Sequence, residues 1–214
     1  MRGHMRTRIR SAAAVGAAAV LVALAGAGPA PAHDTAKKKA GGDGVARVHG
    51  SGRIAYVYSP DDDIRFTLDA RAVPFSQPLP GLPGGLPTDA RGTVKFSHHV
   101  AETGVTVAAE ARVDCLVTGG RTATLTAVIT KSDVSEVGKR LGISVYEGRG
   151  GEPDRLGFSW GVANTEPEST DDNGQVVQPN VGTCMAPAPF APVTKGGFDV
   201  RHAELPPLPE AHRE

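Results

Sequence analysis

The sequence predicts an all-β protein, either an antiparallel barrel or, alternatively, a sandwich, with about eight to ten strands and one short helix. Two observations favour this class. Apolar and polar residues alternate over several short segments, and a period of two places one face of a strand in a core. Glycine and proline, with 27 and 17 residues, make up about a fifth of the chain, against a usual share of about 12%. Such a composition indicates many turns between the segments.

Residues 1–32 have the pattern of a secretion signal peptide. Four arginines within the first ten residues precede an apolar run from Ala12 to Ala27, and Ala30-Pro31-Ala32 offers a cleavage site of small residues before His33. The run of about 16 residues is short for a membrane span. We therefore expect a secreted, extracellular protein that begins near His33 and is not stably inserted in a membrane.

Charge and composition divide the remainder of the chain. Without the four arginines of the signal, 19 Lys and Arg stand against 23 Asp and Glu, a mild acidity that argues against nucleic acid as the main partner. Residues 33–44 lack apolar periodicity and are expected to form a flexible tail. Residues 45–203 have the length of a single β domain, and residues 204–214 are expected to be a disordered, charged tail.

The first strands are expected between residues 45 and 100. Residues 45–58 offer one or two strands interrupted by Gly50-Ser51-Gly52, and residues 59–63 have the proline and aspartates of a turn. Residues 64–72 alternate with Phe66 on the inward face, and residues 93–100 place Phe96 and His98 on one face. Residues 77–86, rich in Pro, Gly and Leu, are expected to be a surface crossover loop or, alternatively, a ligand for a proline-binding partner.

The longest alternating stretch, residues 105–130, predicts an antiparallel hairpin with one buried face. Odd-numbered residues are apolar on both sides of Gly119-Gly120, and cross-strand partners share a face. We therefore expect a three-residue loop, Gly119 to Arg121, that pairs Val117 with Ala123 and Cys115 with Leu125. A bulge elsewhere in the hairpin would satisfy the same requirement.

Beyond the hairpin, the apolar spacing between Lys131 and Gly142 changes to that of one short helix. Residues 143–146 are expected to be a short strand. Residues 156–162 then form the most aromatic inward face, opposite small residues that indicate a close backbone approach. A long loop, residues 164–197, precedes a closing strand near Phe198. The expected core contains Phe66, Phe96, Phe158 and Trp160, with Trp160 fully buried.

The two cysteines, Cys115 and Cys184, are expected to pair, because exported proteins with an even cysteine count form disulfides. The bridge would clamp the long loop onto the central hairpin and, by closing about 70 residues, contribute roughly 4 kcal/mol. A catalytic thiol is the alternative.

No residue is assigned a catalytic, cofactor-binding or metal-binding role, and no cofactor is expected. His98 and His99 are adjacent, so in a strand they point to opposite faces and do not share one ion. Residues 61–63 and 168–174 are acidic and could bind calcium, but aspartate and asparagine also form turns. No serine-hydrolase, zinc-protease or phosphate-binding motif is present in the sequence.

Several segments resemble a group of secreted actinomycete proteins labelled repetin-like: SPDDDIRF (residues 59–66), VDCLVTGG (113–120), DRLGFSW (154–160), Cys184 and APF (188–190). The resemblance covers most of residues 50–200 and implies no activity or site. We therefore expect a secreted, non-catalytic β domain that binds a small ligand, a glycan or another protein. The alternative is a secreted hydrolase that uses carboxylates and His98.

Overall fold

The computed structural model describes residues 44–134, 137–161 and 181–209, so the predicted signal (1–32) and nearly all of the predicted tail (33–44) lie outside it. The described residues contain eight strands: β1 (Arg47–Ile54), β2 (Asp63–Ala72), β3 (Ala90–Val100), β4 (Val105–Gly119), β5 (Thr122–Ser132), β6 (Arg140–Tyr146), β7 (Arg155–Phe158) and β8 (Ala191–Arg201). Each strand is antiparallel to the next, and β8 pairs with β1. The fold is thus a closed antiparallel barrel, and the sandwich alternative is excluded.

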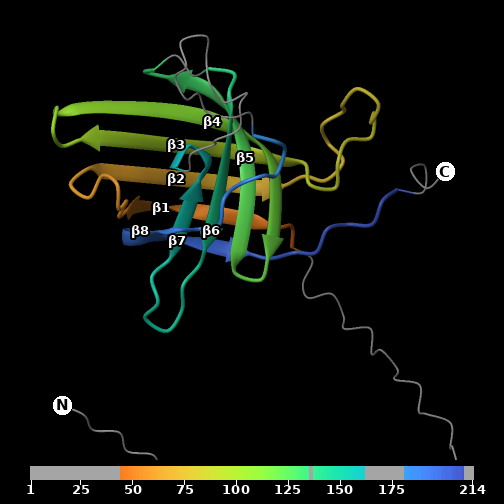
Figure 1. Ribbon diagram of the computed structural model, residues 1–214. Coiled ribbons are helices and arrows are strands. Elements are labelled where there is room, and N and C mark those ends of the chain that lie inside the picture. The colour runs from red at the N-terminus through yellow and green to blue at the C-terminus, as the bar shows by residue number, and fades with distance from the viewer. Residues whose placement is uncertain (1–43, 135–136, 162–180, 210–214) are drawn as a thin grey trace, which may run out of the picture. The chain divides into compact units, whose positions relative to one another are not determined.

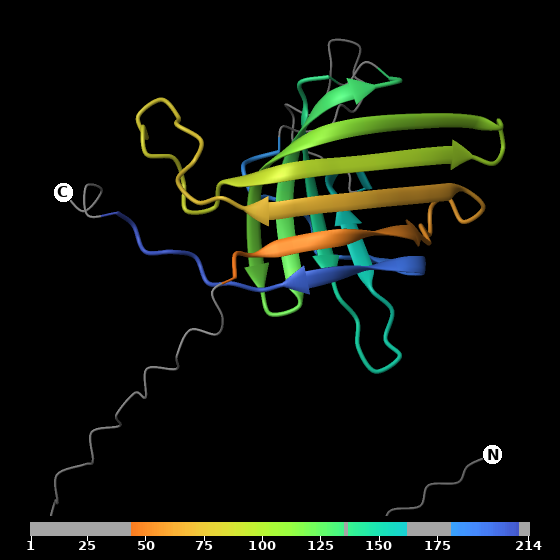
Figure 2. The same ribbon diagram turned by 180° about the vertical axis from the view of Figure 1, so that it is seen from behind.

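The strands cross at steep angles on the two sides of the barrel. In Figure 1, β1, β2 and β3 run across the view, and β5, β6 and β7 run nearly at right angles to them. Figure 2 shows β8, β1, β2 and β3 side by side from behind. The strand β4, 15 residues long, bends along its length, so that one part runs beside β3 and the other beside β5.

Alternation determines which side chains fill the barrel. Inward residues of the first five strands are almost fully buried, including Val48, Ile54, Ile64, Phe66, Leu68, Val94, Ala111, Val113 and Leu125. On β1, β2 and β3 their outward neighbours are mostly charged or hydroxylated and are exposed or half-buried, as the pattern predicts. The residues 45–58 contain one strand rather than two, and Gly50 and Gly52 lie within it.

The hairpin of β4 and β5 has a different register from the predicted one. Near the turn, Gly119 lies opposite Thr122 and Cys115 lies opposite Thr126, so the loop has two residues, not three. A bulge at Asp114 then shifts the pairing, and Val113 lies opposite Ala127. Because of the extra residue, odd-numbered residues of β4 face inward up to Val113, and even-numbered residues face inward after the bulge. Leu116 and Thr118 are therefore buried inside the barrel. The bulge alternative is therefore the one that the chain uses.

The helix predicted between Lys131 and Gly142 is wrong as far as this segment is described. Residues 131–132 end β5, residues 140–142 begin β6, and the described residues between them form turns. Val134 and Val137 are exposed, so their helical spacing has no packing partner. The one helix within the described residues is a 3-10 turn, Ser159–Gly161.

A segment without regular structure, residues 181–190, lies against the outer face of β5, β6 and β7, and we call it the strap. The predicted disulfide joins its Cys184 to Cys115, and the Cys184 amide donates to the buried hydroxyl of Thr126 at 3.2 Å. A Cβ at Gly142 or Gly157 would overlap carbonyl oxygens of the strap. The small residues opposite the aromatic face therefore mark the close backbone approach that the sequence indicated.

The proline-rich loop, residues 77–86, is anchored from beneath. The buried carboxylate of Asp89 accepts backbone N–H groups of Ser76, Gln77 and Leu86 at 2.8–3.0 Å. The Gln77 amide in turn donates to the carbonyl oxygens of Ala90 and Asp114, between β3 and β4. The segment is a loop fixed to the barrel, in agreement with the crossover interpretation.

Candidate functional site

The barrel is filled with side chains at one end and hollow at the other. The hollow, which we call the mouth cavity, has a volume of about 380 Å³ and lies where β1, β3, β5 and β7 end. Its lining consists of Tyr56, Ile64, Phe96, His98, Val107, Ile129, Val134, Leu141, Phe158 and Trp160. Every side chain in the lining except that of His98 is aliphatic or aromatic. The site is therefore an apolar cavity with one imidazole in its wall.

Aromatic rings form one wall and the floor of the mouth cavity. Phe66 is almost fully buried beneath it, and its ring centroid lies 5.6 Å from that of Phe158 and 6.0 Å from that of Phe96. The Trp160 ring lies 4.9 Å from Phe96 and 4.9 Å from Phe158. Such separations are typical of attractive aromatic pairs. The rings pack against the core and leave the cavity open above them.

Trp160 differs from its prediction. The strand β7 ends at Phe158, and Trp160 belongs to the 3-10 turn that follows, where it is half-buried and lines the cavity. Phe96 is also half-buried, whereas Phe66 and Phe158 are core residues as predicted. The turn is held by the Tyr56 hydroxyl, which donates to the Gly161 carbonyl at 3.0 Å. Trp160 is therefore a cavity residue rather than a fully buried one.

His98 is oriented by an aspartate from another part of the chain. Its Nε2 atom lies 2.6 Å from the carboxylate of Asp62, which belongs to the turn between β1 and β2. The other Asp62 oxygen accepts the backbone N–H of Ala101 at 2.9 Å. These contacts fix the imidazole ring at the rim of the mouth cavity.

Two side chains at the rim have shifted pKa values. The hydrogen bond from His98 lowers the pKa of Asp62, with further contributions from the Ala101 N–H, the His98 charge and the Ser59 hydroxyl. Burial raises the pKa of Tyr56, and the neighbouring Tyr58 adds to the effect. At neutral pH Asp62 is therefore an anion and Tyr56 a neutral hydrogen-bond donor.

The histidines and the first acidic turn, which the sequence offered as possible metal ligands, have other partners in the structure. His99 points outward, away from His98, and its Nδ1 atom lies 2.8 Å from the Thr106 hydroxyl. In the acidic turn, Asp62 binds His98, and Asp63 forms ion pairs with Arg53 and Arg65 at 3.2 and 2.8 Å. Among the described residues no group of three His, Cys, Asp or Glu could hold a metal ion. The second acidic cluster, residues 168–174, lies outside the described residues.

Alternation could have identified part of this site, because Ile64, Phe96, His98 and Val107 have the same inward phase as the core. The partnership of Asp62 with His98 spans 36 residues and depends on how the β1–β2 turn folds over β3. Tyr56 follows the end of β1 and has no periodic signal. Sequence reasoning therefore missed Asp62 and Tyr56 as site residues.

No family model, curated protein or solved structure matches the chain. The resemblance to repetin-like proteins accordingly stays a prediction. Within the described residues, no helix has the length and apolar character needed to cross a membrane.

Proposed function

We propose that the protein is an extracellular, non-catalytic carrier or sensor that binds a small apolar molecule in the mouth cavity. The observation that carries the proposal is the cavity itself, about 380 Å³ in volume and lined mainly by apolar side chains. Small-molecule sites are typically concave, apolar and roughly 300–1,000 Å³ in volume. An eight-stranded barrel is just wide enough to be filled by its own side chains or to hold one small ligand.

The lining defines the chemical class of the ligand. The faces of Phe96, Phe158 and Trp160 suit a flat ring system or a conjugated chain, because aromatic faces favour offset stacking. His98, the one strongly polar group of the lining, is held by Asp62 and can serve a single polar substituent. The ligand is therefore an apolar ring compound with one hydrogen-bonding group.

We also propose that the protein is exported from the cell. The signal pattern of residues 1–32 supports it, and so does the Cys115–Cys184 disulfide, because disulfides persist in oxidising compartments. The test is the amino-terminal sequence of the protein recovered from culture medium. A start near His33 is expected, and retention of the full chain in the cytosol would contradict export.

Ligand binding is testable with a neutral apolar dye, N-phenyl-1-naphthylamine. Trp160 is the single tryptophan of the chain and lines the cavity, so energy transfer from Trp160 to the dye reports binding at this place. Val107→Phe fills the cavity from β4, whereas Val105→Phe changes the same strand two residues away, outside the lining.

We expect one dye molecule to bind to the natural protein and to Val105→Phe, and Val107→Phe to bind about tenfold more weakly or not at all. Equal binding by all three proteins would contradict the proposed site. Loss of binding by both variants would show that the dye reports a general change in β4 rather than the cavity.

A second candidate function rests on the His98–Asp62 pair. A histidine oriented by a carboxylate is the arrangement of a general base, which supports a secreted hydrolase that activates water at the cavity rim. With p-nitrophenyl esters as substrates, His98→Ala and Asp62→Asn should then abolish turnover, while His99→Ala, on the outer face, should not. Hydrolysis no faster than in buffer would remove this candidate.

A further inference from the structure

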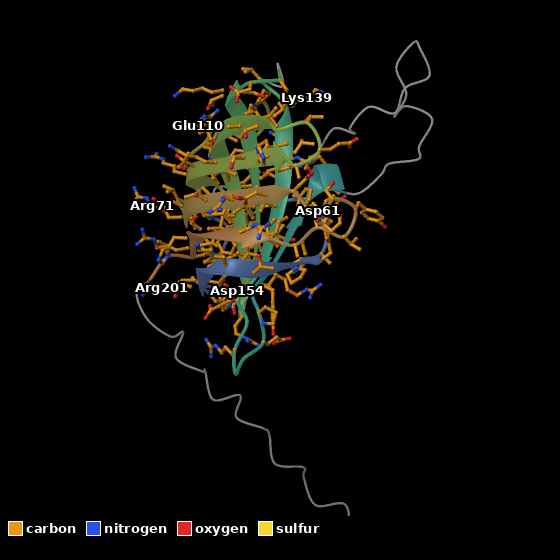
Figure 3. All side chains as sticks on the ribbon, turned by 90° about the vertical axis from the view of Figure 1, so that its left-hand side faces the viewer. Asp61, Arg71, Glu110, Lys139, Asp154 and Arg201 are labelled. Atoms are coloured by element: carbon orange, nitrogen blue, oxygen red, sulfur yellow. A yellow bond between two sulfur atoms is a disulfide. The ribbon has the colours of Figure 1, made fainter. Side chains whose placement is uncertain are left out.

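Four arginines form a continuous row across neighbouring strands on the outer face of the barrel. Arg47 of β1 lies directly opposite Arg201 of β8 and Arg71 of β2, and Arg71 lies opposite Arg91 of β3. All four side chains are exposed. We call these four residues the arginine row. Figure 3 labels two of its members, Arg71 and Arg201, along the same side of the barrel.

The arginine row is unfavourable for folding. Like charges directly opposite each other in a sheet destabilise it, and no hydrogen bond or ion pair joins any of the four guanidinium groups to another described residue. The nearest carboxylates on the same face, Asp69 and Asp199, are two residues away along β2 and β8 and flank His49 rather than the row.

Two other groups of close cations on this surface share an acid. Arg53 lies opposite Arg65, but both contact Asp63 at 3.2 and 2.8 Å. The outward lysines of β3 and β5, Lys95 and Lys131, both contact Glu110 at 3.2 and 3.4 Å. The arginine row differs from these two groups because no described carboxylate forms an ion pair with it, which favours an anion from outside the chain.

The geometry of the row indicates an extended anion. Neighbouring strands are about 4.8 Å apart, so the Cα atoms of the row span about 14 Å perpendicular to the strands. Arg112 of β4 lies opposite Thr93, two residues from Arg91, and lengthens the cationic surface along the same side. Guanidinium groups bind carboxylate, sulfate and phosphate through paired hydrogen bonds. A linear chain with one acidic group on each unit would contact several members at once.

We propose that the arginine row is a binding site for an anionic polysaccharide. The outward residues of β1, β2 and β3 include no Phe, Tyr or Trp, so the surface lacks the large rings on which single-stranded nucleic acid stacks best. The outward positions of the row and its neighbours are polar, and two of them are aspartates, which does not suit insertion into a membrane surface. The row lies where β1 begins and the mouth cavity where β1 ends, so the polysaccharide leaves the cavity open.

The test uses the disulfide-bonded protein from His33 onward and two polyanions, heparin and polygalacturonate, titrated over a range of salt concentrations. Arg47→Ser/Arg71→Ser removes the centre of the row. Arg149→Ser/Lys195→Ser removes the same charge from exposed positions outside it. Thermal unfolding of each protein is measured in parallel.

We expect the natural protein and the control to bind at least one polyanion, more weakly as salt rises. The row variant should bind about tenfold more weakly. The row variant should also unfold at the same temperature as the natural protein or higher, because removal of two arginines relieves like-charge repulsion. A lower unfolding temperature would indicate a structural role and contradict the proposal.

Other results would also overturn it. Binding by the row variant as tight as that of the natural protein would contradict the proposal. Equal loss of binding by both variants would show that only net charge matters. Failure of the natural protein to bind either polyanion would refute the site. Tighter binding to a short DNA duplex or to phosphatidylglycerol vesicles than to either polysaccharide would assign the row to another class of partner.

Discussion

Removal of the Cys115–Cys184 bridge tests how firmly the strap holds the outer wall of the barrel. The variant Cys115→Ala/Cys184→Ala leaves the strand ladders intact, including the β1–β8 pairing that closes the barrel. The strap keeps its other contacts, among them the bond from the Ser144 hydroxyl to the Pro187 carbonyl. The expected effect is therefore a loss of stability without a loss of fold.

The magnitude follows from the loop length and from the backbone at residue 184. The two cysteines are 69 residues apart, and the chain-entropy model assigns a loop of this length about 4 kcal/mol. Cys184 has a φ of 58°, a left-handed conformation that costs a non-glycine residue roughly 1–2 kcal/mol. A strap that relaxes in the variant recovers this cost. The free energy of unfolding should accordingly fall by about 2–4 kcal/mol, and the Tm by roughly 5–15 °C.

Urea unfolding followed by Trp160 fluorescence measures this loss, because the chain has one tryptophan. Cys115→Ala/Cys184→Gly is the companion variant, since glycine tolerates the left-handed conformation. It should keep the strap in place better than the alanine variant, as judged by resistance to limited proteolysis. A loss below about 1 kcal/mol in both variants would refute the view that the bridge holds the long loop.

Three further perturbations test individual contacts. Gly142→Ala should destabilise the protein by about 1–3 kcal/mol, because the added Cβ would overlap the strap carbonyl of Met185. Gly119→Ala should change stability little, because its Cβ would meet open space. Equal unfolding midpoints in urea for the two variants would contradict the packing of the strap. Asp89→Ala should cost roughly 3–5 kcal/mol, since three partly buried N–H groups lose their acceptor. Asp89→Asn should cost less because it keeps an oxygen, and calorimetry decides the order. The pKa of Asp62 is lower in the folded protein than the ordinary aspartate value of about 3.9, so its ionised carboxylate stabilises the fold at pH values above about 3.9. This contribution disappears as pH falls through the pKa of the folded state. Asp62→Asn should therefore flatten the acid-unfolding curve below about pH 4, whereas Asp61→Asn should leave it unchanged; identical curves for the two variants would exclude the effect.

Alternation and the cysteine count were sufficient to predict most of the strands and the covalent link. Alternation is a local property, because successive side chains of an extended chain point to opposite faces whatever lies beyond them. The inward phase of Phe66, Val94 and Leu125 could therefore be read directly. The pairing of Cys115 with Cys184 followed from their number, since two cysteines in a chain predicted to be exported have one partner each. The same local reasoning failed between Lys131 and Gly142, where the described residues form strand ends and turns despite their helical spacing.

Barrel closure, strand register and both proposed sites depend on contacts between distant parts of the chain. The pairing of β1 with β8 joins the two ends of the domain, and no local pattern distinguishes it from the edges of a sandwich. The bulge at Asp114 depends on the curvature of β4, and it alone reversed which residues face inward. The mouth cavity exists because the aromatic rings leave space above Phe66, and Asp62 reaches His98 through the fold of a turn. The arginine row arises from register across four strands: each arginine has an ordinary outward position in its own strand, and only the alignment of the strands makes the four into one surface.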